Sequence, residues 1–95
     1  ALMKVHQYDA QVNDFVEVEL PDEFSEEYRR RYELVQSKLA DVHGKFSGVR
    51  LEGLLLAQIA CRLTTECGFP VIVTICFGHE SGRHNSIAAY PVPTP

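Results

Sequence analysis

The amino-acid sequence predicts an α+β domain in which two helices pack on a small, mainly antiparallel four-stranded sheet, in the order β-β-α-α-β-β. Three observations lead to this fold class. Polar and apolar residues alternate over residues 14–20, apolar residues recur every three or four positions over residues 28–46, and residues 71–77 form an almost continuous β-branched run. Alternation indicates a strand, three-to-four spacing indicates a helix, and a continuous apolar run indicates a strand covered on both faces.

The first predicted element is a β-hairpin made of residues 3–8 and 14–20. Its second strand alternates most clearly, because Val16, Val18 and Leu20 all point to one face. Residues 9–14, DAQVND, are rich in the side chains that turns favour. The alternative is a single strand that follows an irregular arm.

The next predicted element is an amphipathic helix with Ser25 as its N-cap and Gly44 as its stop. Its apolar stripe consists of Tyr28, Tyr32, Val35, Leu39, Val42 and Phe46. Two ion pairs four residues apart are expected on its outer surface, Glu26 with Arg30 and Glu27 with Arg31.

A second helix is predicted over residues 49–67, with Ser47 as its cap and Gly68 as its stop. One face carries Leu56, Ile59, Ala60, Leu63 and Cys67. Leu51, Leu54 and Leu55 extend the apolar surface well round the helix. A helix that is apolar on most of its circumference is normally buried on most of it.

Two further strands are predicted, over residues 69–77 and 86–93. Pro91 and Pro93 confine the far end of the second one to a sheet edge, so residues 91–95 are expected to form a tail or linker. At the other end of the chain, residues 1–2 precede Met3, and no helix or strand is predicted for them.

Length and charge limit the classes of function. A chain of 95 residues makes one domain, residues 1–95, with a modest core. The net charge of −4 argues against nucleic acid and against an anionic membrane surface as partners. Three cysteines without paired spacing, and no segment typical of a signal peptide, favour a cytoplasmic protein. No cofactor is predicted.

Residues 76–86, CFGHESGRHNS, are the one stretch that combines several of the side chains found in catalytic, ligand-binding or metal sites. The base expectation is a polar hairpin turn. If the loop binds a ligand or an anion, the candidates are Gly78, His79, Glu80, Ser81, Arg83 and His84. If it is catalytic, His79, Arg83 and His84 would supply proton transfer and anion stabilisation. A metal site made of Cys76, His79 and His84 is a further alternative, although the spacing matches no strong motif.

Assembly is the better-supported prediction. A striped helix, a largely apolar helix and a doubly apolar strand present more apolar surface than a single two-layer domain can cover. We therefore expect a symmetric homodimer, formed through the second helix or through the open face of the sheet. The leading hypothesis is a non-enzymatic protein-interaction domain, and the alternative is a small hydrolase or transferase that uses the loop.

Overall fold

The structure, a computed structural model, describes residues 2–10, 12–21, 25–46, 53–77 and 85–93. Within these ranges the side chains of residues 43–46, 53–54, 75–77 and 85–86 are not described. The elements in chain order are β1 (Leu2–Asp9), β2 (Asp14–Pro21), α1 (Glu26–Phe46), α2 (Gly53–Cys67), β3 (Val71–Phe77) and β4 (Asn85–Pro91). The α+β class and the β-β-α-α-β-β order predicted from the sequence are therefore confirmed.

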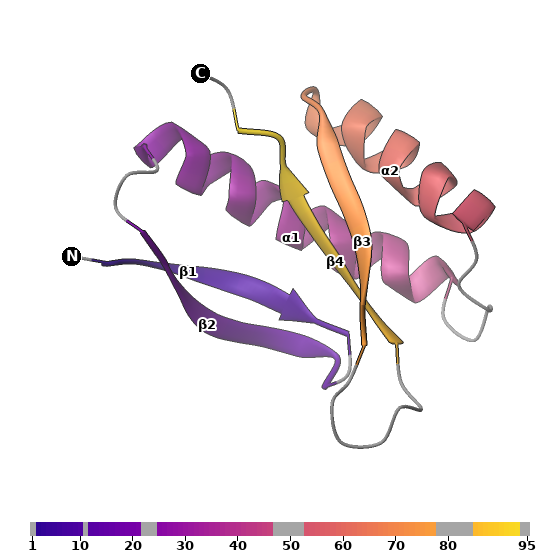
Figure 1. Ribbon diagram of the computed structural model, residues 1–95, viewed down its shortest axis with the longest axis horizontal. Coiled ribbons are helices and arrows are strands. Elements are labelled where there is room, and N and C mark those ends of the chain that lie inside the picture. Colours follow the sequence, from indigo (N-terminus) through magenta and orange to yellow (C-terminus); the bar gives the residue numbers. More distant parts are fainter. Residues whose placement is uncertain (1, 11, 22–24, 47–52, 78–84, 94–95) are drawn as a thin grey trace.

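The strand pairing corrects the expected sheet. Over the described residues, the strands form two separate two-stranded antiparallel sheets and not one four-stranded sheet. In the first, Val5 lies opposite Val18, and in the second, Val73 lies opposite Ala89. Figure 1 shows β1 and β4 running at a steep angle to each other. Strands that cross in this way cannot keep the even spacing that a continuous hydrogen-bonded ladder requires.

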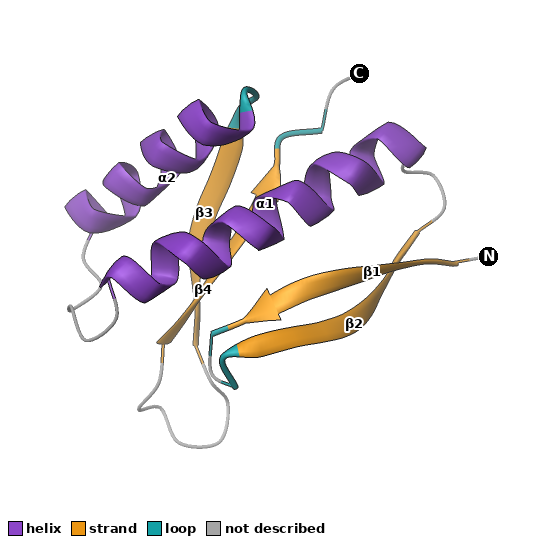
Figure 2. Cartoon of the chain, turned by 180° about the vertical axis from the view of Figure 1, so that it is seen from behind, coloured by secondary structure: helices purple, strands orange, loops and turns teal. Residues whose placement is uncertain are grey.

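The helices form one layer and the two hairpins form the other. α1 packs on both β1 and β4, while α2 packs on α1 and β3. In Figure 1 the β3–β4 hairpin lies in front of α1, and Figure 2, seen from behind, shows α1 crossing in front of this hairpin and running beside the β1–β2 hairpin. The molecule measures 36 × 31 × 20 Å, and the short dimension matches two layers. Each hairpin therefore has one face that neither helix covers.

α1 forms where its cap and its stripe predict. The Ser25 hydroxyl accepts a 3.1 Å hydrogen bond from the Tyr28 N–H, which satisfies a donor of the first turn. The helix continues past the expected stop at Gly44 to Phe46. Its outer surface carries the predicted Glu27–Arg31 pair at 2.9 Å. The other ion pair differs from expectation, because Glu26 contacts Arg29 at 2.9 Å and not Arg30.

α2 is less apolar on its outer side than the sequence suggested. Ile59 and Leu63 are fully buried against the core, and Leu55 and Leu56 are partly buried. The side chains of Leu51 and Leu54 and the predicted cap Ser47 lie outside the described residues. In the described part, the exposed positions are Ala57, Gln58, Cys61, Arg62, Thr65 and Glu66. The described turns of α2 therefore present small and polar side chains to the exterior.

The core lies where α1 meets the other elements. Its buried residues are Tyr8, Val35, Leu39, Val42, Ile59, Leu63, Val71, Ile87 and Ala89. They come from both helices and from three of the four strands. Because burial of one such aliphatic side chain contributes about 1.5–3 kcal/mol, this cluster is the main stabilising contact between the two layers.

The ends of the described chain are also held. Leu2 pairs with Pro21 in the first hairpin. Pro91, expected in the tail, lies within β4 opposite Val71, and the Val92 N–H donates a 3.0 Å hydrogen bond to the Pro70 carbonyl. No described helix combines the length and the apolar character needed to cross a bilayer.

Candidate functional site

The polar loop predicted as a candidate site lies outside the described residues. This applies to Gly78, His79, Glu80, Ser81, Arg83 and His84, and the side chain of Cys76 is not described either. The described ladder reaches the loop on both sides, since its last pair joins Phe77 to Asn85. The ligand-binding, catalytic and metal hypotheses for this loop therefore stay predictions. Elsewhere in the described chain, no three His, Cys, Asp or Glu side chains gather as metal ligands would.

Gln36 of α1 bridges the seam between the two hairpins, and it is the one side chain among the described residues that hydrogen-bonds to both of them. Its Oε1 accepts a 3.1 Å hydrogen bond from the Tyr8 N–H in β1. Its Nε2 donates a 2.6 Å hydrogen bond to the Ala89 carbonyl in β4. Gln36 is only 1% exposed and is the one buried polar side chain among the described residues. Its amide takes the place that a peptide group of a neighbouring strand would occupy in a continuous sheet.

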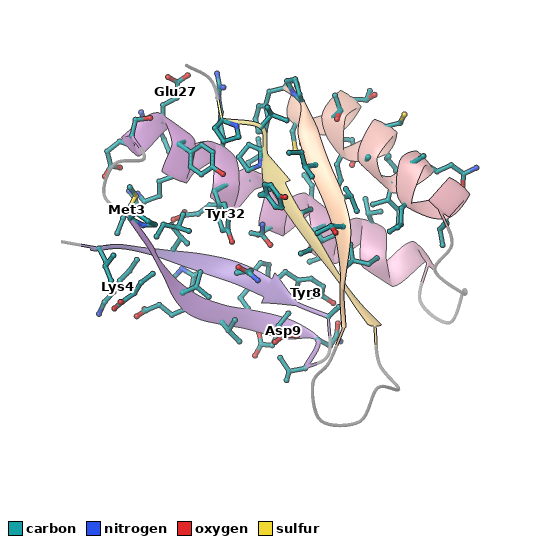
Figure 3. All side chains as sticks on the ribbon, viewed as in Figure 1. Met3, Lys4, Tyr8, Asp9, Glu27 and Tyr32 are labelled. Carbon is teal, nitrogen blue, oxygen red and sulfur yellow. The ribbon has the colours of Figure 1, made fainter. Side chains whose placement is uncertain are left out.

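Two tyrosines of α1 attach the helix to the strands on either side of this seam. The Tyr32 hydroxyl donates a 2.5 Å hydrogen bond to Gln7 Oε1 in β1, and Figure 3 shows this side chain between α1 and β1. The Tyr28 hydroxyl donates a 3.3 Å hydrogen bond to the Pro91 carbonyl at the end of β4. Burial, with a smaller contribution from Tyr28, raises the pKa of Tyr32 to about 12. Both hydroxyls therefore act as structural donors at neutral pH.

The uncovered face of the second hairpin is apolar or neutral where it is described. Side chains alternate along β3 and β4, so Val71, Ile87 and Ala89 are buried under the helices. The opposite positions are Ile72, Thr74, Ala88 and Tyr90, which we call the open face of the β3–β4 hairpin. Ile72 is 37% exposed and lies directly opposite Tyr90. This arrangement leaves an apolar pair without cover from α1 or α2.

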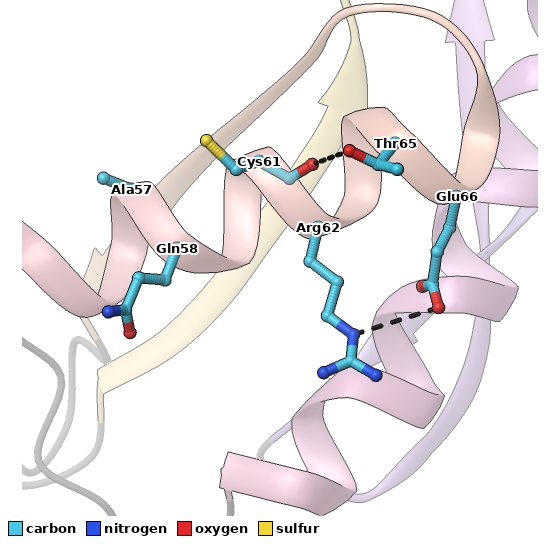
Figure 4. A pocket seen from close by; sticks show the side chains of 6 residues that line it. All are labelled: Ala57, Gln58, Cys61, Arg62, Thr65 and Glu66. Carbon is cyan, nitrogen blue, oxygen red and sulfur yellow. Dashed lines mark hydrogen bonds and ion pairs between the residues drawn. The ribbon is translucent and has the colours of Figure 1, made fainter.

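The outer surface of α2 contains an open groove, drawn in Figure 4, lined by Ala57, Gln58, Cys61, Arg62, Thr65 and Glu66. Its polar groups bind one another along the helix. The Thr65 hydroxyl donates to the Cys61 carbonyl at 2.9 Å, and Arg62 Nε lies 3.8 Å from Glu66 Oε1. The nearby thiol of Cys67 has its pKa raised, mainly by burial, which disfavours the reactive thiolate. The thiol that lines the groove itself is that of Cys61, and no basic side chain among the described residues hydrogen-bonds to it, so the described groove does not show a nucleophile paired with a base.

Sequence reasoning missed Gln36. Gln36 lies four residues after Tyr32 and three before Leu39, which places it within the buried stripe. A polar residue at an otherwise apolar core position was the available signal. The partners could not be read from the sequence, because they lie 28 and 53 residues away along the chain.

Comparisons of this chain with protein-family models, with curated proteins and with solved structures gave no match.

Proposed function

We propose that this chain is a non-enzymatic protein-interaction domain that acts as a homodimer, with the open face of the β3–β4 hairpin as the interface. The observation that carries the proposal is the exposed Ile72 opposite Tyr90, on a strand surface that neither helix covers. Burial of such side chains against a second copy is favourable by about 25 cal/mol for each Å² of apolar surface.

The absence of charged side chains on this face supports a second copy as its occupant. The whole chain carries a net charge of −4, so two copies repel each other at long range and can meet only where few charges face each other. The four residues of the open face of the β3–β4 hairpin are all uncharged. In contrast, Lys4, Glu17 and Glu19 lie on the uncovered side of the β1–β2 hairpin. A neutral apolar patch is the surface through which two acidic copies can meet without burying unpaired charge.

The size of the molecule also fits. A standard interface buries about 800 Å² on each partner. The broad side of the molecule, seen in Figure 1, measures 36 × 31 Å. A contact of this size would be centred on the β3–β4 hairpin and would extend over most of this side. A two-fold axis through the hairpin would make the contact self-complementary.

The test is sedimentation velocity of the native chain and of the variant Ile72→Lys. We expect the native chain to sediment as a dimer at micromolar concentration. Ile72→Lys places a charge in the centre of the interface on both copies, so the dissociation constant should rise at least about a hundredfold, because burial of an unpaired charge costs several kcal/mol.

Leu34→Lys is the matched control. Leu34 is 39% exposed on α1, almost the same as Ile72, but it lies in the helical layer. The control should leave the dimer intact. A native chain that stays monomeric at millimolar concentration, or equal weakening by the two variants, would refute the proposed interface.

A further inference from the structure

We propose a second interaction surface, the outer edge of β2, which takes up an extended segment of another protein in which basic and apolar residues alternate. The segment would add to β2 as an antiparallel strand. This inference goes beyond the proposed dimer, because it uses a different hairpin and a partner of different chemistry.

The hydrogen-bonding pattern of the first hairpin shows which backbone groups point outward. The Tyr8 N–H points away from β2, because it donates to Gln36. The pair Tyr8–Phe15 is therefore one of the pairs that do not exchange ladder hydrogen bonds. Since such pairs alternate along an antiparallel hairpin, Phe15, Glu17 and Glu19 direct their N–H and C=O groups to the outer edge of β2.

Two of these outward donors are available. The Phe15 N–H already donates a 2.7 Å hydrogen bond to the Asp14 carboxylate, which confirms that it lies outside the ladder. Nothing in the described part of the chain accepts a hydrogen bond from the N–H groups of Glu17 and Glu19. An edge with a row of such groups is a template for an added strand.

The charge of the edge selects the partner. β2 carries Asp14, Glu17 and Glu19 and has no basic residue. The exposed Lys4 of β1 lies 3.6 Å from Glu17, and it is the one basic side chain of the described hairpin in ion-pair contact with β2. Opposite charges on directly opposed residues of neighbouring strands contribute about 0.2–1 kcal/mol per pair. Lysine or arginine opposite Glu17 and Glu19 is therefore favoured.

A second copy of β2 is disfavoured at the same edge. In an antiparallel pairing of two β2 strands centred on Glu17 or on Val18, each Glu17 faces a glutamate of the other copy. Like charges directly opposite each other destabilise a strand pair. The acidic edge thus discourages self-association and favours a basic strand.

The other face of β2 explains why the partner segment is expected to carry apolar residues between its basic ones. Val16, Val18 and Leu20 point to the same side as Val5 of β1, which is buried. The three side chains of β2 are only partly buried, because α1 packs on β1 and β4 and β2 is the outermost strand (Figure 2). An added strand would cover them with its own apolar side chains, which alternate with the basic ones.

The test uses a short, capped peptide that alternates lysine and valine, with a glutamate–valine peptide as the matched control. Binding is followed by backbone amide shifts of the native protein. We expect the lysine peptide to move the amide signals of Glu17 and Glu19 most, and the glutamate peptide to bind at least about tenfold more weakly. The double variant Glu17→Lys/Glu19→Lys should invert this preference.

Backbone pairing is tested on the peptide, so that the protein stays unchanged. In antiparallel addition, the peptide residues opposite Glu17 and Glu19 are the lysines, and their N–H groups bond to β2. N-methylation of the lysine nitrogens should weaken binding about fivefold or more, whereas N-methylation of the valine nitrogens should change it little.

Three results would overturn the proposal. The first is absence of binding of the lysine peptide at millimolar concentration. The acidic edge would then serve only to prevent other strands from pairing with β2. The second is equal loss from both N-methylated peptides. The third is a change of oligomeric state in Glu17→Lys/Glu19→Lys, which would assign the edge to a second copy. Sedimentation of Ile72→Lys addresses the proposed dimer separately, so failure of one proposal is distinguishable from failure of the other.

Discussion

Gln36 shows how a single side chain can join two sheets. Its amide accepts from the Tyr8 N–H and donates to the Ala89 carbonyl, as a peptide group would. Both partners are backbone groups at buried residues, so neither is easily satisfied by water. The steep crossing of β1 and β4 leaves the two strands without a common ladder, and Gln36 supplies the missing hydrogen bonds at the point where the strands approach each other.

We predict that Gln36→Met destabilises the protein by about 3 kcal/mol. Methionine has a similar volume but leaves the Tyr8 N–H and the Ala89 carbonyl buried without a partner, and each such loss costs about 1–3 kcal/mol. Urea unfolding measures the change. Gln58→Met is the control, since Gln58 is exposed on α2 and its replacement should stay within about 0.5 kcal/mol. Equal effects of the two variants would contradict the bridging role.

At the scale of elements, the link from α2 to β3 depends on Gly68. This residue adopts a positive φ of 82°, and its N–H donates a 2.9 Å hydrogen bond to the Thr64 carbonyl. The Thr64 hydroxyl then accepts a 3.1 Å hydrogen bond from the Val71 N–H at the start of β3. The last turn of α2 therefore sets the point at which β3 begins.

Gly68→Ala should lower stability by about 1 kcal/mol. A Cβ at this position would meet nothing within 4 Å, so the cost comes from the left-handed backbone and not from a clash. Gly68→Asn should cost less, because asparagine tolerates this conformation better. Thermal or urea unfolding distinguishes the two. A loss for asparagine as large as that for alanine would argue against backbone strain as the cause.

At the scale of the whole molecule, α1 is the element that holds the two hairpins together. It contributes Val35, Leu39 and Val42 to the shared core and bonds to both hairpins through its tyrosines and Gln36. Because the two sheets do not share a ladder in the described chain, stability of the molecule depends on these helix-to-strand contacts.

The raised pKa of Tyr32 predicts a loss of stability in alkaline solution. An unfolded tyrosine loses its proton near pH 10, whereas the folded Tyr32 keeps it up to about pH 12. Between these values the folded state binds more protons, so the free energy of unfolding falls as pH rises, by about 2–3 kcal/mol in total. Below pH 10 the contribution is fully present.

Urea unfolding at pH 8, 10 and 11.5 tests this dependence, with Tyr32→Phe as the comparison. The variant should be less stable than the native chain at pH 8, by about 1 kcal/mol for the lost hydrogen bond to Gln7. It should also lose less stability as the pH rises, because it cannot ionise at this position. Parallel pH profiles of the two proteins would contradict the assignment.

The amino-acid sequence by itself determined which segments become helices and strands. The alternation of residues 14–20, the stripe from Tyr28 to Val42, the N-cap Ser25 and the stop at Gly68 all predicted elements that the structure contains. These signals are local, because the spacing of apolar side chains and the capping groups act within one or two turns of chain. The sequence indicated the polar loop of residues 78–84 as the candidate functional site, and this loop lies outside the described residues.

Only the tertiary structure decided how these elements meet. It separated the expected four-stranded sheet into two hairpins, placed Gln36 between them, and left Ile72 and the edge of β2 outside the helical cover. The physical reason is that the periodicity of apolar residues shows which face of a helix or strand is apolar. It does not show which other element covers that face. Pairing and cover depend on the crossing of elements far apart in the chain, and this geometry has no counterpart in local spacing.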